Sequence, residues 1–217
     1  MKHKVPKKVL LALLAVILLS ALVFLLFPRR ETAAPELVRY EPTAISGSYS
    51  AYRAAHGTGA ASGESHTVPA GDLILASGEA LSGDYYHWQD DVPVEFVINI
   101  ANPGWYAVYF TYQPRGESYL PSELSLYLNG EIPFDEAAGI SLDHLWRDAA
   151  GEVTVDRYGN DVAFRQEPLH RWLTVPLTDA ARMYLSGLRF YLESGLNRFK
   201  VEKTSGEFYL REVIVAG

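Results

Sequence analysis

Tyrosine and tryptophan residues occur in this sequence beside Asp, Asn and Arg, in segments rich in turn-forming residues. The first such segment, residues 82–91 (SGDYYHWQDD), contains Tyr85, Tyr86, Trp88 and Asp90. Sugars present patches of C–H bonds that lie on aromatic rings, and their hydroxyls need planar polar partners. We therefore predict that these four residues contribute to a carbohydrate-binding surface.

A second segment of this kind, residues 155–172, reads VDRYGNDVAFRQEPLHRW. Its candidate ligand contacts are Asp156, Tyr158, Asn160, Asp161 and Arg165. The same segment is also typical of an ordered loop, because its three arginines can neutralise its acids locally and its apolar residues can anchor it. These predicted anchors are Val155, Val162, Phe164 and Leu169. In both segments the aromatic residues have the alternative role of packing their rings while their polar tips stay in water.

Catalytic motifs are absent from the sequence, which contains no GxSxG, HExxH, P-loop or CxxC pattern. The six His are scattered, and none pairs with another at metal-ligand spacing on one element. Two carboxylate pairs, Asp143 with Asp148 and Asp156 with Asp161, leave a glycosidase-like arrangement open, although their spacing is not diagnostic. We expect a protein without enzyme activity.

The chain has no Cys for a thiolate metal site, and an oxygen-only site for Ca²⁺ stays open. A calcium site needs several carboxylates and carbonyls that converge on one point. The richest local sources of such oxygens are Asp90–Asp91 and Asp156–Asp161. The run DRYGND lacks the alternating acids of an EF-hand loop, so a structural Ca²⁺ stays a weak expectation and no other cofactor is expected.

An apolar run near the N-terminus, Val9–Phe27, contains no charged residue over nineteen positions. As a helix it would be about 28 Å long, which is close to the thickness of a bilayer core. Residues 1–8 form a basic stub before it, so the positive-inside rule predicts a cytoplasmic N-terminus and an extracytoplasmic C-terminal domain. A cleaved signal peptide is the alternative, but its apolar region is usually shorter, at about 7–15 residues. We predict a single-pass transmembrane helix that stays in the cell membrane.

Charged residues divide at the same boundary. Six of the 19 basic residues lie in positions 1–30 and all 26 acidic residues follow, so the remainder has a net charge of −13. Nucleic-acid binding requires a basic surface, and the composition excludes it.

The rest of the chain is predicted to hold a spacer and one domain. Residues 28–68 are rich in Ala, Ser, Gly and Thr and read as the spacer, in which residues 48–56 form a short helix ended by Gly57. Residues 69–217 contain about eight runs of alternating apolar residues with short turns and no long amphipathic helix. This pattern predicts an all-β fold, an antiparallel β-sandwich or jelly roll.

Three local features of this domain are predicted in more detail. The runs 92–100 and 105–113 are expected to pair as antiparallel neighbours, and the dipeptide at 129–130 (Asn-Gly) predicts a tight hairpin. Residues 133–170 are too long for an ordinary connection and too apolar for disorder. We predict an ordered insert packed on the sandwich, with a helical turn around residues 142–148.

The order of these runs resembles that of galactose-binding-like β-sandwiches of the carbohydrate-binding-module kind. The runs that carry the resemblance are NPGWYAVYFTY, LYLNGEIPF, LRFYLESGLNRFKVE and EFYLREVIV. The stretch from Trp146–Asp148 through Gly159–Asp161 to Arg165–Gln166 is its most specific portion. It is similar to the N-terminal β-sandwich region of extracellular solute-binding proteins from bacterial carbohydrate ABC transporters.

This resemblance implies sugar-related binding outside the membrane and no catalysis. It also implies an ABC transporter permease or a separate solute-binding protein as partner, because no counterpart of the family's two-lobed solute-binding domain is expected here. The leading hypothesis is a membrane-anchored extracytoplasmic carbohydrate-binding module. The alternatives are a structural or protein-interaction module, whose contact surface is the insert, and a glycan-active enzyme.

Overall fold

The structure is a computed structural model that describes residues 47–57, 59 and 63–217. One compact unit comprises Thr43–Gly217. The basic stub 1–8, the predicted transmembrane helix 9–27 and most of the predicted spacer lie outside the described residues. Among the helices of the described ranges, none has the length and apolar character needed to span a bilayer.

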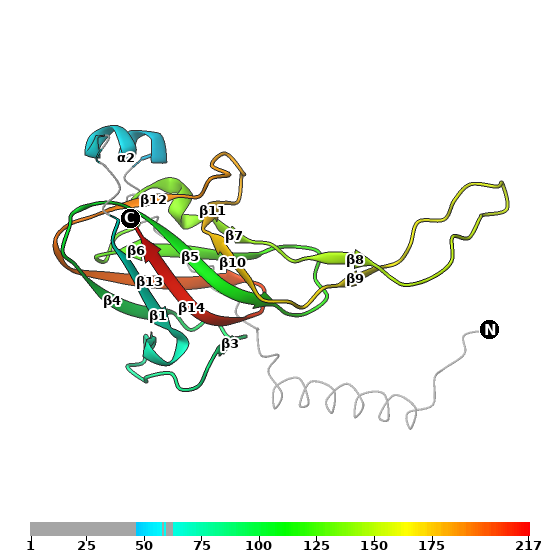
Figure 1. The fold of residues 1–217 in the computed structure, drawn as a ribbon, viewed down its shortest axis with the longest axis horizontal. Coiled ribbons are helices and arrows are strands. Elements are labelled where there is room, and N and C mark those ends of the chain that lie inside the picture. The colour runs from blue at the N-terminus through cyan, green and yellow to red at the C-terminus, as the bar shows by residue number, and fades with distance from the viewer. Residues whose placement is uncertain (1–46, 58, 60–62) are drawn as a thin grey trace, which may run out of the picture. The chain divides into compact units, whose positions relative to one another are not determined.

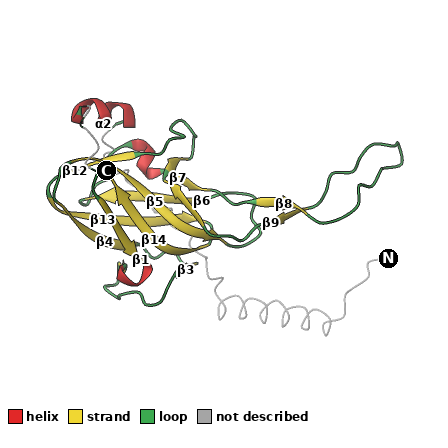
Figure 2. Ribbon diagram, viewed as in Figure 1, coloured by secondary structure: helices red, strands yellow, loops and turns green. Residues whose placement is uncertain are grey.

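Two antiparallel sheets of six strands each are stacked as the layers of a sandwich (Figures 1 and 2). Sheet A consists of β1 (Ser65–Pro69), β3 (Tyr86–Trp88), β5 (Gly104–Pro114), β10 (Leu173–Pro176), β12 (Arg189–Leu192) and β14 (Phe208–Ala216). Sheet B consists of β2 (Ile74–Leu75), β4 (Val94–Ile100), β6 (Ser122–Leu128), β7 (Ile140–Leu142), β11 (Thr178–Asp179) and β13 (Gly195–Ser205). The predicted antiparallel sandwich is confirmed.

A third, two-stranded sheet, which we call the ribbon, consists of β8 (Trp146–Asp148) and β9 (Gln166–Pro168). The helical elements are α2 (Tyr49–His56) and two 3₁₀ turns, η1 (Ala70–Asp72) and η2 (Asp135–Ala138). The ribbon and the loop that joins its strands extend away from the sandwich in Figure 1.

The core lies between the two sheets and follows the alternation of the sequence. Four residues of β5, Tyr106, Val108, Phe110 and Tyr112, are buried on its inner face as predicted. They belong to one hydrophobic cluster with residues of sheet B such as Phe199, which is fully buried. Burying a large apolar side chain of this kind contributes about 1.5–3 kcal/mol, so this cluster is the main source of stability.

The strands β4 and β5 lie in different sheets, which corrects the predicted pairing of the runs 92–100 and 105–113. β4 pairs with β13 and β2 in sheet B, whereas β5 pairs with β14, β10 and β12 in sheet A. The intervening turn crosses the edge of the sandwich and is held by Glu64, whose carboxylate accepts hydrogen bonds from the backbone N–H groups of Ala101 and Asn102. The hydroxyl of Tyr106 donates to the Asn102 carbonyl at 2.6 Å. Alternation fixes which face of a strand is buried, but it does not choose the neighbouring strand.

Glu64 makes the stability of this corner dependent on pH. The hydrogen bonds from Ala101 and Asn102 lower its pKa from 4.5 to about 2. A lowered carboxyl pKa stabilises the folded state above the ordinary pKa, and this contribution is lost as the pH falls through the folded value. We expect the melting temperature to fall between pH 4.5 and about 2, and to fall less in a Glu64→Gln variant, as measured by circular dichroism. An equal fall in both proteins would show that other carboxyls control this range.

The predicted helix at residues 48–56 is confirmed as α2. The Ser48 hydroxyl caps it by accepting a hydrogen bond from the Ala51 N–H at 3.3 Å, and the helix ends at Gly57, whose φ is 70°. This helix belongs to the domain, since the ring of Tyr52 lies 4.9 Å from that of Phe134. Because β1 also pairs with β14, the sandwich begins before the predicted boundary at residue 69.

The predicted hairpin at residues 129–130 is also confirmed. Asn129 and Gly130 have φ values of 53° and 94°, the left-handed pair that a two-residue hairpin turn requires. Leu128 and Glu131 exchange backbone hydrogen bonds across the turn.

The insert 133–170 is ordered, and its first part packs into the core of the sandwich. Phe134, Ala137, Ile140 and Leu142 are fully buried, and β7 adds a strand to sheet B. The helical turn expected around residues 142–148 is wrong, because both ends of that range are strands.

Two of the predicted apolar anchors of the insert are wrong as well. Val155 and Val162 are 63% and 47% exposed. The reason is that β8 and β9 pair only with each other in the described sheets, so the ribbon satisfies its backbone hydrogen bonds without a strand partner in the sandwich.

Candidate functional site

A hollow of about 400 Å³ lies where the ribbon meets the sandwich. Its lining comes from the loop after β5, from β8, and from β9 with its flanks. The lining residues are Glu117, Tyr119, Trp146, Arg165, Gln166, Glu167, Pro168 and His170. Its volume falls within the range of about 300–1,000 Å³ found for small-ligand sites, and segments far apart in the sequence form it together.

The apolar part of the hollow is a stacked pair of rings. The ring centroids of Tyr119 and Trp146 lie 4.2 Å apart with an interplanar angle of 17°. Tyr119 is 72% exposed, so the stack presents an aromatic surface to solvent instead of to the core. Because each ring holds the other in place, little side-chain entropy remains to be lost when a ligand packs on them.

The polar part of the hollow is held by hydrogen bonds across the ribbon. Arg147 forms an ion pair with Glu167 at 3.4 Å, and the amide of Gln166 donates to the carboxylate of Asp148. Both are register partners of the β8–β9 pairing, so the strand register itself orients these side chains.

His170 fixes the end of the hollow that is nearest sheet A. Its Nδ1–H donates to the Pro114 carbonyl at 2.8 Å, and its own carbonyl accepts from the amide of Gln113 at 2.9 Å. The Nδ1 bond leaves Nε2 as the ring nitrogen that can meet a ligand. This end of the hollow is therefore fixed to β5 at two points.

The chemistry that this set supports is recognition of a polyhydroxylated ligand. The stacked rings offer a flat apolar surface for C–H groups, and the carboxylate, amide, guanidinium and imidazole groups around them can exchange hydrogen bonds with hydroxyls. A two-carboxylate hydrolase needs a pair of acids free to act on one bond. Of the two carboxylates that line the hollow, Glu167 is held by Arg147.

In each acid pair proposed from the sequence, at least one carboxylate is held by another group. Asp143 pairs with Arg182, Asp148 accepts from Gln166, and Asp156 accepts from Asn160. In the described ranges no three His, Cys, Asp or Glu side chains are grouped as a metal site would need, and Asp91 is paired with Lys203 at 2.8 Å. Binding of Ca²⁺ at Asp90–Asp91 or Asp156–Asp161 stays a prediction.

Among the ligand contacts predicted from the sequence, Arg165 lines the hollow. Tyr85 is 50% exposed, and its ring lies 4.9 Å from that of Tyr209 on the outer face of sheet A. The structure thus places these two predicted residues on a surface that a ligand can reach.

Trp88 is wrong as a ligand contact. It is fully buried, its ring lies 5.4 Å from that of Phe208, and its indole N–H donates to the Val92 carbonyl. The pairing of β3 with β14 turns Tyr86 toward the core on the same side, where burial and then the charge of Asp90 raise the pKa of its hydroxyl. Asp90 itself is exposed at the end of β3.

The structure does not bring the other predicted contacts to the hollow. Asp156, Tyr158, Asn160 and Asp161 lie in the loop beyond β8 and β9, at the far end of the ribbon in Figure 1. The Asp156 carboxylate accepts from the backbone N–H groups of Tyr158 at 2.8 Å and Asn160 at 2.9 Å. The hydrogen bonds from Asn160 lower the pKa of this carboxyl, so Asp156 acts as the turn former of the loop.

Local neutralisation of the loop's acids by arginine is not found either. Arg157 lies 4.6 Å from the centre of the Tyr158 ring. Within the described part of the chain, the ion pairs of Arg involve Arg147, Arg182 and Arg198.

Sequence reasoning missed the stacked pair at the centre of the hollow. Tyr119 was visible as an aromatic residue in a turn (GESYLPSE), and Trp146 as one next to apolar residues. They are separated by 27 positions, and no periodicity connects a loop after one strand to a strand of the insert. The unusual length of the insert was the available signal.

Comparison with known proteins gives structural neighbours only. No family model matches the sequence, and no curated protein matches it. Among solved structures, the C-terminal family 6 carbohydrate-binding module of LamC, a laminarinase from Zobellia galactanivorans, has 14% identity and a TM-score of 0.38, and the match covers 71% of this chain and 100% of the module. A family 35 module of Abf62 from Cellvibrio japonicus has 12% identity and a TM-score of 0.38, with 71% and 94% covered.

A third neighbour is a larger enzyme. The β-(1,4)-mannanase of Podospora anserina, which joins a family 26 glycoside hydrolase to a family 35 module, has 13% identity and a TM-score of 0.39. The match covers 71% of this chain and 28% of the mannanase. The neighbours that are matched over nearly their whole length are carbohydrate-binding modules with a β-sandwich fold. At these TM-scores the likeness carries no inference about a ligand, which rests on the hollow alone.

Proposed function

We propose that this protein is a non-catalytic carbohydrate-binding module whose ligand packs on the Tyr119–Trp146 stack. The observation that carries the proposal is an exposed stacked ring pair in a hollow rimmed by Glu117, Arg165 and Gln166. Buried aromatic pairs stabilise cores, but a pair held open to solvent beside planar polar groups has the surface that a sugar ring needs.

We further propose that the apolar run Val9–Phe27 holds the module at the outer face of the cell membrane. Its length matches a bilayer core of about 30 Å, and the basic residues before it favour a cytoplasmic N-terminus. Binding would then serve sugar capture near an uptake system, with an ABC transporter permease or a separate solute-binding protein as partner. The acidic surface after residue 30 disfavours nucleic acid as a ligand.

The proposal predicts saturable binding of at least one polysaccharide. The full chain in mild detergent is titrated calorimetrically with glucans, mannans, xylans, pectins and bacterial wall polymers. We expect heat of binding and a raised melting temperature with the polymer that binds, since a ligand that binds only the folded state stabilises it. The chain length of that polymer should be unchanged after incubation. No heat with any polymer, together with an unchanged melting temperature, would refute the binding role, and a shortened polymer would refute the non-catalytic one.

A protein-contact role is the second candidate function. Val153, Val155 and Tyr158 on the far loop of the ribbon are 64%, 63% and 73% exposed. Apolar side chains gathered on an exposed segment mark contact surfaces in many proteins. Absence of glycan binding in the titrations above would favour this role.

A further inference from the structure

A second group of aromatic rings lies on the outer face of sheet A. We call Tyr85, Trp172, Tyr209, Arg115 and Arg211 the platform. The ring of Tyr85 lies 6.1 Å from that of Trp172 and 4.9 Å from that of Tyr209. Tyr209 and its register partner Gln113 point outward, because Leu210 beside Tyr209 is buried in the core. The group is therefore a surface feature of β14 and its neighbours, separate from the hydrophobic core.

Two arginines lie over these rings. The guanidinium carbon of Arg211 is 3.9 Å from the centre of the Trp172 ring, and that of Arg115 is 5.0 Å from the centre of the Tyr209 ring. In the described part of the chain neither arginine forms an ion pair with an acid. A guanidinium stacked on a ring keeps its N–H edge free, and that edge matches pairs of oxygens such as neighbouring hydroxyls or a carboxylate.

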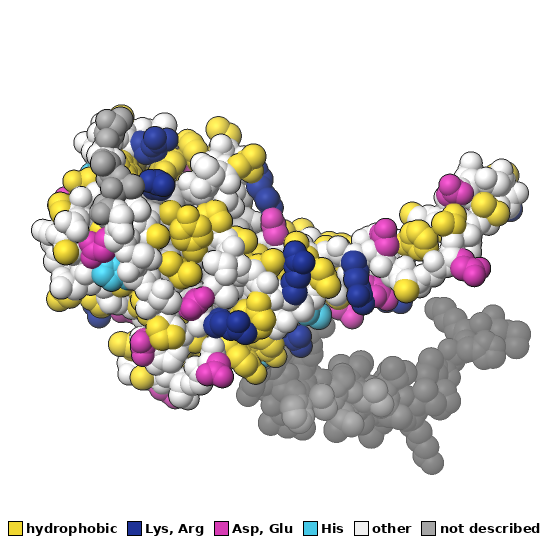
Figure 3. Space-filling model, viewed as in Figure 1, with side chains coloured by type: hydrophobic (Ala, Val, Ile, Leu, Met, Phe, Trp, Pro, Cys, Tyr) yellow, Lys and Arg dark blue, Asp and Glu magenta, His cyan; other side chains and the backbone are white. Residues whose placement is uncertain are grey.

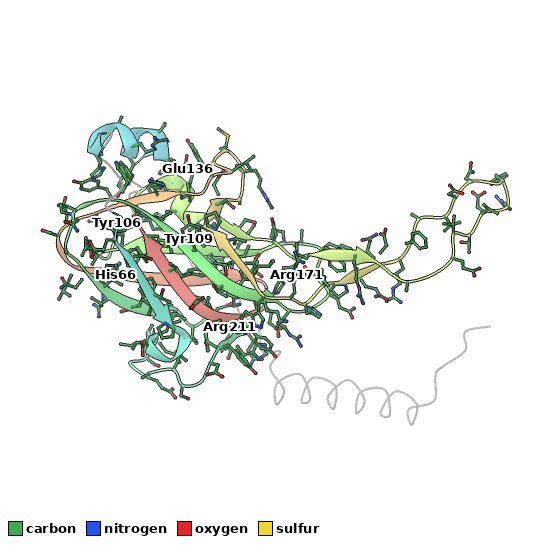
Figure 4. All side chains as sticks on the ribbon, in the orientation of Figure 1. His66, Tyr106, Tyr109, Glu136, Arg171 and Arg211 are labelled. Carbon is green, nitrogen blue, oxygen red and sulfur yellow. The ribbon has the colours of Figure 1, made fainter. Side chains whose placement is uncertain are left out.

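Figure 4 places Arg211 on the same face of the sandwich as the base of the ribbon. Figure 4 shows Arg211 on β14 and Arg171 where the chain approaches β10 from the ribbon. In Figure 3, Lys and Arg side chains gather on this face near the point where the ribbon leaves the sandwich, with hydrophobic side chains among them.

A short stretch of chain connects the platform to the hollow. His170 lines the hollow and Trp172 belongs to the platform. Two residues of chain span at most about 7 Å, so the two surfaces adjoin. The hydrogen bonds of His170 to Pro114 and Gln113 anchor this stretch to β5, the strand that also precedes Arg115 and the hollow residue Glu117. One rigid support thus carries both surfaces.

We propose that the platform is a second subsite for the same ligand, so that the protein binds an internal stretch of a polysaccharide chain instead of a free sugar or a chain end. This inference rests on the proposed carbohydrate-binding function. Both surfaces are open, which lets a polymer enter and leave along their length. Ring stacking at two adjoining places makes the affinity depend on chain length, because the second contact is intramolecular once the first has formed.

The length of the oligosaccharide is the variable that tests this inference. The full chain and a Tyr85→Ala variant are titrated with glucan, mannan, xylan and galacturonan oligosaccharides from disaccharide to octasaccharide. For the series that binds, we expect the native affinity to rise about tenfold or more with length and then level off. The variant should lose that gain for the longest oligosaccharide and bind the disaccharide as the native chain does. Tyr85 is half exposed, so the variant should keep its melting temperature.

The control is Tyr158→Ala, which removes an exposed ring from the far loop of the ribbon. It should leave the affinity for the disaccharide and for the longest oligosaccharide unchanged. Equal affinity for short and long oligosaccharides, with binding lost in a variant of the hollow, would overturn the second subsite and leave the binding function standing. A Tyr85→Ala loss of the same size at every length would also overturn it. No binding in any of the four series, together with no heat from any polymer of the wider titration, would overturn both proposals.

Discussion

A Trp146→Ala variant is expected to bind glycan at least about tenfold more weakly than the native chain, with little change in melting temperature. The substitution removes one ring of the stack and leaves Tyr119, which is 72% exposed, free to rotate. The ligand then loses a flat contact surface and must also order the remaining ring. Fold stability is spared because β8 pairs only with β9 among the described strands.

The matched control for this prediction is Tyr158→Ala. Tyr158 is 73% exposed, almost the same as Tyr119. It lies in the same insert as Trp146, in the loop that joins β8 and β9. Titration calorimetry with the polymer that binds should give the native affinity for this variant. Equal losses in Trp146→Ala and Tyr158→Ala would mean that the ribbon acts as a whole, and native affinity in Trp146→Ala would remove the stack from the site.

The inner faces of β5 and β3 show what the sequence can determine. Tyr106, Val108, Phe110 and Tyr112 alternate in the sequence and are all buried, because a strand presents every second residue to the same side. Trp88 belongs to the same rule, since Tyr86 and Trp88 are two positions apart and both face the core. Residue type and turn-rich surroundings predict a ligand contact for Trp88, whereas the strand period groups it with Tyr86 on one face.

The period of two does not predict which strand pairs with which, or how the site is assembled, because both depend on residues far apart in the sequence. β4 and β5 are separated by a short turn, yet they lie in different sheets because β13 and β14 offer each of them a partner. The hollow depends on the same kind of information. It forms because the register of β8 on β9 pairs Trp146 with Pro168 and the loop after β5 reaches them.

A Gly206→Ala variant is expected to lower the free energy of unfolding by about 3 kcal/mol, a large part of the stability of a typical domain. Gly206 lies in the turn that carries the chain from β13 in sheet B to β14 in sheet A, with φ of 84°. A left-handed φ costs a non-glycine residue about 1–2 kcal/mol. An added Cβ would also lie 2.7 Å from the Cα of Ser122, which is backbone and only 1% exposed, so relief requires a shift at the start of β6.

Gly130→Ala separates the two causes, because Gly130 has φ of 94° in the hairpin after β6 but no atom within 4 Å of an added Cβ. It should lose only the strain, about 1–2 kcal/mol, and both losses follow from urea unfolding of the full chain at an unchanged m-value. The difference between the variants then measures how tightly the β13–β14 crossover packs on Ser122. If Gly206→Ala lost no more than Gly130→Ala, the crossover would have room to shift, and the end of the sandwich that carries β3 and the platform would be looser than this close contact implies.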